Sequence, residues 1–98
     1  MASLLSSAQI SEGMQTLHAD WSIDADNRAI EREFGFNSYL QGLSFANSVA
    51  WIAEQQDHHP DLHLGYAKCR VYFTTHSAGG LTVLDFNAAR AVDQLLNT

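Results

Sequence analysis

The run SYLQGLSFANSVAWIAEQQ, residues 38–56, constrains the fold more than any other part of the sequence. Its apolar residues recur every three or four positions, which is the spacing of an α-helix. One broad apolar face, widened by Phe45 and Ile52, is predicted to comprise Leu43, Ala46, Val49, Ala50 and Ala53. Leu40 and Trp51 fall on the opposite side of the helix, the side that normally faces solvent.

A helix that is apolar almost all round is usually buried on both sides. In a chain of 98 residues we expect the second cover to come from another copy of the chain. The alternative interpretation is that Trp51 is a half-exposed aromatic side chain and needs no cover.

An N-terminal helix is indicated by a capping pattern. Ser6 and Gln9 have the spacing of a capping box, in which each satisfies a backbone N–H of the other, and this predicts a helix over 7–18. Gly13 weakens this helix by about 1 kcal/mol relative to alanine.

The remaining patterns predict two β-hairpins and a last helix. Alternating apolar and polar residues, bounded by turn-forming residues, predict strands at 21–23, 28–36, 62–66 and 68–75. Thr82 is expected to cap the last helix, with Asp85 as an acidic cap at N3. The order α-β-β-α-β-β-α predicts an α+β two-layer sandwich, a four-stranded antiparallel sheet with helices on one face. We expect a single domain over residues 1–98.

The same periodicities predict which side chains face the core. In the strands these are Ile30, Phe34, Phe36, Cys69, Val71, Phe73 and Thr75. In the first and last helices they are Ile10, Met14, Leu17, Phe86, Ala89, Val92, Leu95 and Leu96.

The charge balance excludes some classes of partner. The chain has 5 Lys and Arg against 11 Asp and Glu, a formal net charge of −6. A protein that holds nucleic acid by its phosphates needs clustered cations, so we expect no direct nucleic-acid binding. An anionic membrane surface is disfavoured for the same reason.

The cysteine count and the N-terminus suggest a compartment. Cys69 is the single cysteine, so no disulfide within the chain is possible and no CxxC zinc pair exists. The first residues lack the basic and apolar regions of a signal peptide, and no apolar run reaches the length of a membrane span. We therefore expect a soluble, cytoplasmic protein.

The stretch DHHPD, residues 57–61, is the strongest candidate for chemistry. His58 and His59 follow the predicted end of the central helix, where Pro60 stops it, and His76 ends the last strand just before a double glycine. Histidine, with an unperturbed pKa of about 6.5, can both give and take protons near neutrality.

Each of these histidines also has a structural interpretation. His58, His59 and His76 could be surface or structural residues. Asp57 and Asp61 could orient the two imidazoles, and Glu54 could either hydrogen-bond within the site or be solvated.

A metal site is not favoured. His59 and His63 have a ligand-like spacing, and His58 and His76 could join them. Histidines four apart cooperate on a helix, however, whereas Pro60 and a strand separate this pair. We therefore expect no metal.

One spaced pattern resembles the pterin-4a-carbinolamine dehydratase family. It consists of Glu54, His58-His59-Pro60, Tyr66, His76 and Asp85 at fixed spacings, within a longer resemblance from about Leu5 to the C-terminus that includes Trp21 and the segment TTHSAGGLTVLD.

The resemblance implies a hydro-lyase that needs no cofactor. Family enzymes remove water from 4a-hydroxytetrahydrobiopterin to give quinonoid dihydropterin, which recycles the pterin cofactor of aromatic amino acid hydroxylases. It implies His58, His59 and His76 as catalytic residues, with His58 and His76 transferring protons and His59 orienting the pterin. Trp21, Glu54 and Pro60 are then expected to contribute to substrate binding, Pro60 by fixing the turn.

The resemblance also implies partners and leaves alternatives open. Family members form homodimers or homotetramers through the central helix, and some stabilise the dimer of a homeodomain transcription factor. An aromatic amino acid hydroxylase is a further expected partner. Many members have Arg or Lys where this chain has Leu84, so substrate affinity or preference is expected to differ. A non-catalytic dimerisation cofactor, or an enzyme for another pterin as in molybdopterin metabolism, remain alternatives.

Overall fold

The computed structural model describes residues 2–96. In chain order its elements are α1 (Ser7–Gln15), β1 (Ser22–Ile23), β2 (Ile30–Gly35), α2 (Tyr39–Gln56), β3 (Asp61–Leu64), β4 (Lys68–Phe73), the 3₁₀-helix η1 (His76–Ala78) and α3 (Val83–Gln94). The predicted order α-β-β-α-β-β-α is confirmed, and the short η1 turn is an addition to it. No helix within the described range combines the length and apolar character needed to cross a membrane.

The helices begin where the capping residues predict. Ser6 and Gln9 form the expected capping box at α1, and Thr82 and Asp85 form a second one at α3. Helix α1 ends at Gln15, three residues before the predicted end, because Thr16 turns back and donates both its hydroxyl and its backbone N–H to the carbonyl of Gly13. Leu17 remains buried beyond this turn.

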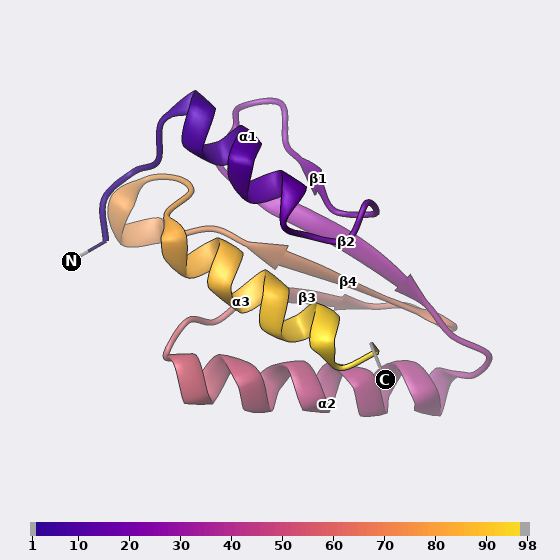
Figure 1. Cartoon of the computed structure of the whole chain (residues 1–98). Coiled ribbons are helices and arrows are strands. Elements are labelled where there is room, and N and C mark those ends of the chain that lie inside the picture. Colours follow the sequence, from indigo (N-terminus) through magenta and orange to yellow (C-terminus); the bar gives the residue numbers. More distant parts are fainter. Residues whose placement is uncertain (1, 97–98) are drawn as a thin grey trace.

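The sheet joins the two predicted hairpins through their second strands. Its order is β1-β2-β4-β3 and all three pairings are antiparallel. The central pairing runs from Ile30 opposite Phe73 to Gly35 opposite Lys68. Figure 1 shows the helices in front of this sheet, with α3 lying between α1 and α2.

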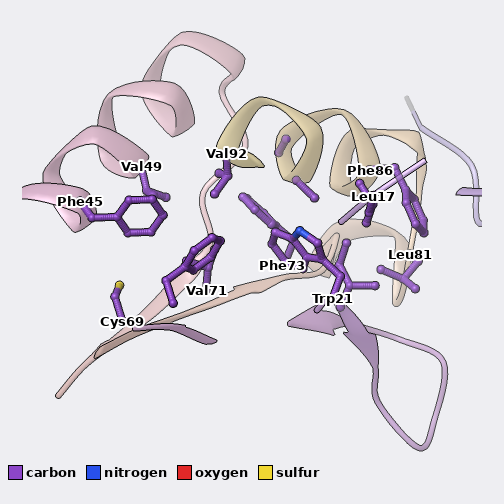
Figure 2. Close-up of a cluster of buried hydrophobic side chains, with 14 of the residues drawn as sticks. Leu17, Trp21, Phe45, Val49, Cys69, Val71, Phe73, Leu81, Phe86 and Val92 are labelled. Atoms are coloured by element: carbon purple, nitrogen blue, oxygen red, sulfur yellow. The ribbon is translucent and has the colours of Figure 1, made fainter. Parts of the chain in front are cut away.

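The core lies between the sheet and the three helices. It contains side chains from one face of the sheet and from all three helices, so the helices cover a single face. Figure 2 shows part of this cluster, in which Val71 and Phe73 of β4 point toward Val49 of α2 and Val92 of α3. The two-layer α+β fold expected from the sequence is therefore present.

The buried face of α2 differs from the prediction. It consists of Gly42, Phe45, Ala46, Val49 and Ala53. Phe45 is central to it, because its ring packs against Phe34 and Phe36 at centroid distances of 4.5 and 5.2 Å. This rotates the helix so that two residues predicted to be inside, Leu43 and Ala50, lie on the exposed side.

The outer side of α2 is apolar, as predicted. Leu40 is 69% exposed and Trp51 is 70% exposed, and the outward Leu43 extends the same surface. One core residue predicted for the last helix is also wrong. Leu96 is 52% exposed, because α3 ends at Gln94 and the chain then leaves the core.

Candidate functional site

The end of α2 turns His58 into the protein. Asp57 adopts a left-handed backbone conformation with φ of 51°, and this reversal lets the N–H of His58 donate to the carbonyl of Ala53 at 3.1 Å. The His58 ring is then stacked on Phe73 of β4, with centroids 6.0 Å apart and planes 11° from parallel. His58 is only 9% exposed.

Asp85 is the partner of His58. Its carboxyl group is completely buried, and Oδ1 forms a hydrogen bond of 2.6 Å with Nε2 of His58. The other oxygen, Oδ2, accepts from the hydroxyl of Thr75 at 2.8 Å and from the backbone N–H of Thr82 at 2.9 Å. These three hydrogen bonds, one from each of three residues, satisfy the buried carboxyl group of Asp85.

His59 points the other way. It is exposed, and its Nε2 lies 2.5 Å from Oε2 of Glu54, one turn back along α2. Glu54 makes this hydrogen bond to His59 while its side chain stays 72% exposed, so both of its expected descriptions apply. The expectation that Asp57 and Asp61 orient the imidazoles is replaced, since Asp85 and Glu54 are the carboxylates in contact with them.

His76 opens the short η1 turn and is exposed. Its neighbour Thr75 holds the turn in place, because the Thr75 N–H donates to the Gly80 carbonyl at 3.1 Å and its hydroxyl reaches Asp85. Gly79 has φ of 80°, a conformation that glycine adopts without strain. Through Thr75, the segment that carries His76 is tied to the carboxylate that holds His58.

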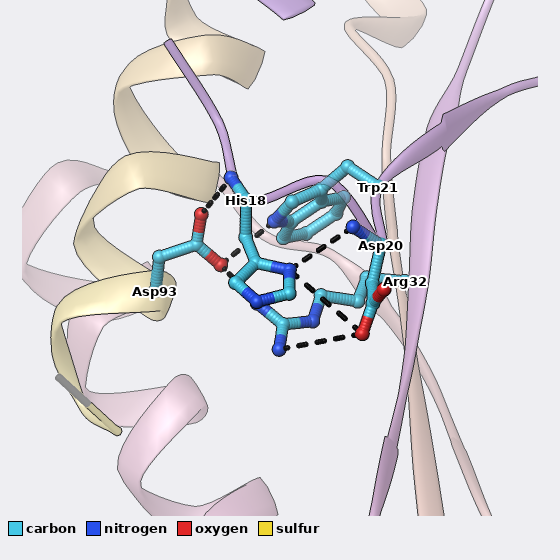
Figure 3. A network of polar contacts seen from close by, with 5 residues as sticks. All are labelled: His18, Asp20, Trp21, Arg32 and Asp93. Carbon is cyan, nitrogen blue, oxygen red and sulfur yellow. Dashed lines mark hydrogen bonds and ion pairs between the residues drawn. The ribbon is translucent and has the colours of Figure 1, made fainter. Parts of the chain in front are cut away.

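Trp21 lies in the core. It is 4% exposed, and its indole N–H donates to Asp93 at 2.7 Å, next to the guanidinium of Arg32 at 2.8 Å from the same oxygen (Figure 3). Trp21 also packs on Phe73 at a centroid distance of 6.1 Å, and Phe73 in turn carries the ring of His58. Its expected role in substrate binding stays a prediction, as does that of the half-buried Pro60.

The sequence patterns did not connect Thr75, Thr82 and Asp85 with His58. Thr75 was expected only as an inward strand residue, Thr82 only as a helix cap, and Asp85 as a helix cap that also belongs to the family pattern, with no stated contact to His58. A usable signal was present, since polar side chains at positions predicted to be buried require hydrogen-bond partners. The periodicity indicates burial for Thr75, but it does not identify a partner that is distant along the chain.

Within residues 2–96, which the structure describes, no group of three or more His, Cys, Asp and Glu side chains is arranged to hold a metal ion. The candidate histidines therefore form no metal cluster in this range. His63 lies on the outer face of the sheet, where its ring contacts that of Tyr72 at 5.7 Å between centroids.

The arrangement can perform proton transfer. When the carboxylate of Asp85 accepts this hydrogen bond, Nε2 of His58 carries a proton, and a neutral imidazole in this tautomer presents a basic lone pair at Nδ1. A buried carboxylate also stabilises the imidazolium that forms when Nδ1 takes up a proton. His58 is thus suited to act as a base.

Sequences similar to this chain point to one family. The family model described as Pterin 4 alpha carbinolamine dehydratase matches residues 3–95. A Legionella pneumophila (strain Corby) protein named "Putative pterin-4-alpha-carbinolamine dehydratase" is 45% identical over 92 residues, covering 94% of this chain and 81% of its own. A Nitrosomonas eutropha protein of the same name is 49% identical over 83 residues, covering 85% of this chain and 72% of its own.

Two solved structures share the fold. A transcriptional coactivator/pterin dehydratase from Brucella melitensis has a TM-score of 0.86 at 31% identity, covering 93% of this chain and 96% of its own. A pterin dehydratase-like protein identified as a RuBisCO assembly factor in the alpha-carboxysome has a TM-score of 0.68 at 22% identity, covering 83% and 94% of the two chains. The second likeness concerns the fold alone.

Proposed function

The chain belongs to the pterin-4a-carbinolamine dehydratase family, and from this premise we propose that it dehydrates 4a-hydroxytetrahydrobiopterin to quinonoid dihydropterin. The observation that carries the proposal is the buried pair of His58 and Asp85. This pair provides a base in a fixed position for a reaction that requires proton transfer. The product would return to the pterin cycle of aromatic amino acid hydroxylases.

The reaction requires one acid and one base. The bond from C4a to the hydroxyl oxygen breaks as that oxygen receives a proton and leaves as water. The proton on N5 is removed, and its electron pair forms the double bond between N5 and C4a. In our proposal Nδ1 of His58 takes the N5 proton, and the exposed His76 delivers a proton to the hydroxyl.

The remaining candidates would bind and orient the pterin. His59, paired with Glu54, offers a polar pair at the end of α2, and Pro60 fixes the turn that separates the two histidines. Trp21 would act indirectly by supporting the position of His58, since it packs on the Phe73 ring against which His58 is stacked. These four residues are expected to affect KM more than kcat.

The test is the dehydration rate of enzymatically generated 4a-hydroxytetrahydrobiopterin, measured above the spontaneous rate. We expect His58→Ala and His76→Ala each to lower kcat by about 10²-fold or more, because each removes one proton-transfer group. His63→Ala is the matched control, since His63 lies on the outer face of the sheet and should leave the rate unchanged.

Either of two results would contradict the proposal. One is a folded wild type that does not accelerate dehydration over buffer. The other is an equal loss of rate in the His58→Ala, His76→Ala and His63→Ala variants, which would indicate a general effect on folding. Circular dichroism of each variant separates folding from chemistry.

A partner-binding role is also supported by one observation. The outer side of α2 exposes Leu40, Leu43 and Trp51, which is an apolar surface on a helix otherwise packed against the core. We propose that this surface mediates formation of a homodimer or homotetramer. The name of the Brucella protein includes a coactivator, so a transcription factor is a second candidate for the same surface.

A further inference from the structure

The hydrogen bonds around Asp85 determine the direction of each hydroxyl proton. Oδ2 of Asp85 accepts the hydroxyl proton of Thr75. Because Thr75 has only one such proton, the 2.8 Å contact between the two threonine hydroxyls must have Thr82 as the donor. Thr82 in turn accepts from the backbone N–H of Leu84 at 3.2 Å. The donors therefore run in one direction, from the first turn of α3 to the carboxylate.

This chain of donors keeps Asp85 an acceptor. With two donors on Oδ2, including the N–H of Thr82, this oxygen acts only as an acceptor. In this arrangement Oδ1 faces Nε2 of His58 as the remaining acceptor of the carboxylate. The four residues involved are at most 9% exposed, so water does not substitute for these bonds.

We propose that Thr75 and Thr82 are positioning residues that set the tautomer of His58 through Asp85, an inference that rests on the proposed function. They hold the proton on Nε2 and leave Nδ1 basic. The first turn of α3, which Thr82 and Asp85 cap, and the base of the reaction are thereby parts of one hydrogen-bonded unit.

Loss of the Thr75 hydroxyl permits a different arrangement. Oδ2 loses one donor and the Thr82 hydroxyl loses its acceptor. A proton on Oδ1 of Asp85 can then donate to Nε2 of His58, while Nδ1 carries the imidazole proton, with the total number of protons unchanged. In that form Nδ1 has no lone pair with which to accept the proton from N5.

The experiment compares wild type with Thr75→Val, which removes the hydroxyl and keeps the shape, and Thr75→Ser, which keeps the hydroxyl. ¹⁵N NMR of histidine-labelled protein at about pH 8, where an unperturbed imidazole is neutral, reports the tautomer. The His58 signals are assigned by their absence in His58→Ala. Dehydration kinetics give kcat and KM for the same samples.

We expect wild type and Thr75→Ser to show Nε2 protonated and Nδ1 unprotonated. In Thr75→Val we expect the two nitrogen signals to move toward the opposite tautomer and kcat to fall about 10–100-fold, with KM within about 2-fold. Thr74→Val is the matched control, because the Thr74 hydroxyl bonds the carbonyl of Arg28 outside the site. It should leave the tautomer and kcat unchanged.

The two proposals fail in different ways. A wild-type His58 protonated on Nδ1 would overturn the inference without any variant, even if Thr75→Val did not fold. An active wild type whose tautomer is the same in Thr75→Val would also overturn it and leave the dehydratase proposal standing. An inactive wild type that shows the expected tautomer shift would overturn the dehydratase proposal alone.

Discussion

Cys69 shows what burial does to a single titratable residue. It lies in the central strand β4, opposite Phe34 on one side and Leu64 on the other, and is 0% exposed. Burial raises the pKa of its thiol, because the thiolate would have to form without solvent. The folded protein therefore holds this proton more tightly than the unfolded chain does.

This difference predicts alkaline destabilisation. The stabilising contribution is fully present below the unfolded thiol pKa of about 8.5 and is lost as the pH rises toward the higher folded value. We expect the free energy of unfolding, measured by urea titration, to fall above about pH 8.5. In Cys69→Ala this part of the slope should disappear, although its stability at pH 7 is lower because a cavity remains. A wild-type stability that stays constant between pH 8 and 10 would contradict the assignment.

Residue-level roles were only partly predictable from the sequence. His58, His59 and His76 could be selected as candidates because they are at a helix end and a strand end rather than at periodic apolar positions. The opposite orientations of His58 and His59 could not be predicted. These orientations depend on the left-handed backbone of Asp57 and on Asp85, which lies 27 residues after His58 in the chain. Contacts between residues so far apart in the sequence cannot be predicted from local periodicity.

At the level of elements, local sequence patterns predicted where helices begin. Capping residues identified the starts of α1 and α3 because caps act within three residues of each other. The ends were less predictable: α1 stops at Gln15 because of hydrogen bonds made by Thr16, a residue that helices elsewhere tolerate. The exposed side of α2 also had to be corrected, since packing of Phe45 sets its rotation.

Gly13 of α1 gives a test in which helix propensity and packing have opposite effects on stability. Helix propensity alone predicts that Gly13→Ala stabilises the protein by about 1 kcal/mol. A Cβ at this position, however, would lie 2.8 Å from ring atoms of Phe86, which is itself 2% exposed. Overpacking of this kind typically costs about 1–3 kcal/mol, so we expect a net loss of stability.

The measurement is the urea midpoint of Gly13→Ala against that of Ser11→Ala, an exposed position in the same helix. Ser11→Ala should gain a few tenths of a kcal/mol, since nothing opposes its propensity. If Gly13→Ala were the more stable of the two, the Phe86 ring would have to yield, and the contact between α1 and α3 would be looser than the geometry indicates.

At the scale of the molecule, the sequence predicted the order of elements and the two hairpins, but not which of their strands join in the sheet. Pairing of β2 with β4 brings together residues about 40 positions apart, such as Ile30 and Phe73, and no turn signal encodes it. It is this pairing that places Phe73 in the centre, between Trp21 and His58.

The outer side of α2 leads to a prediction about assembly. Leu40 and Trp51 are separated by about 16 Å along the axis of α2, and together with Leu43 they leave this part of its outer side apolar and exposed in a single chain. We expect a second copy to cover it, because burial of apolar area is the main driving force for association. Light scattering of the purified protein should then give a mass at least twice the 10.8 kDa of one chain.

The double variant Leu40→Glu/Trp51→Glu should dissociate to single chains, because two carboxylates on each copy would have to be buried in the interface. Circular dichroism should remain that of the wild type, since neither side chain belongs to the core. Gln15→Glu, which adds a charge to an exposed position on α1, should keep the oligomer and so control for charge alone. A wild type that scatters as one chain at about 100 µM would contradict self-association, and the exposed Trp51 would then be the half-exposed aromatic of the alternative interpretation.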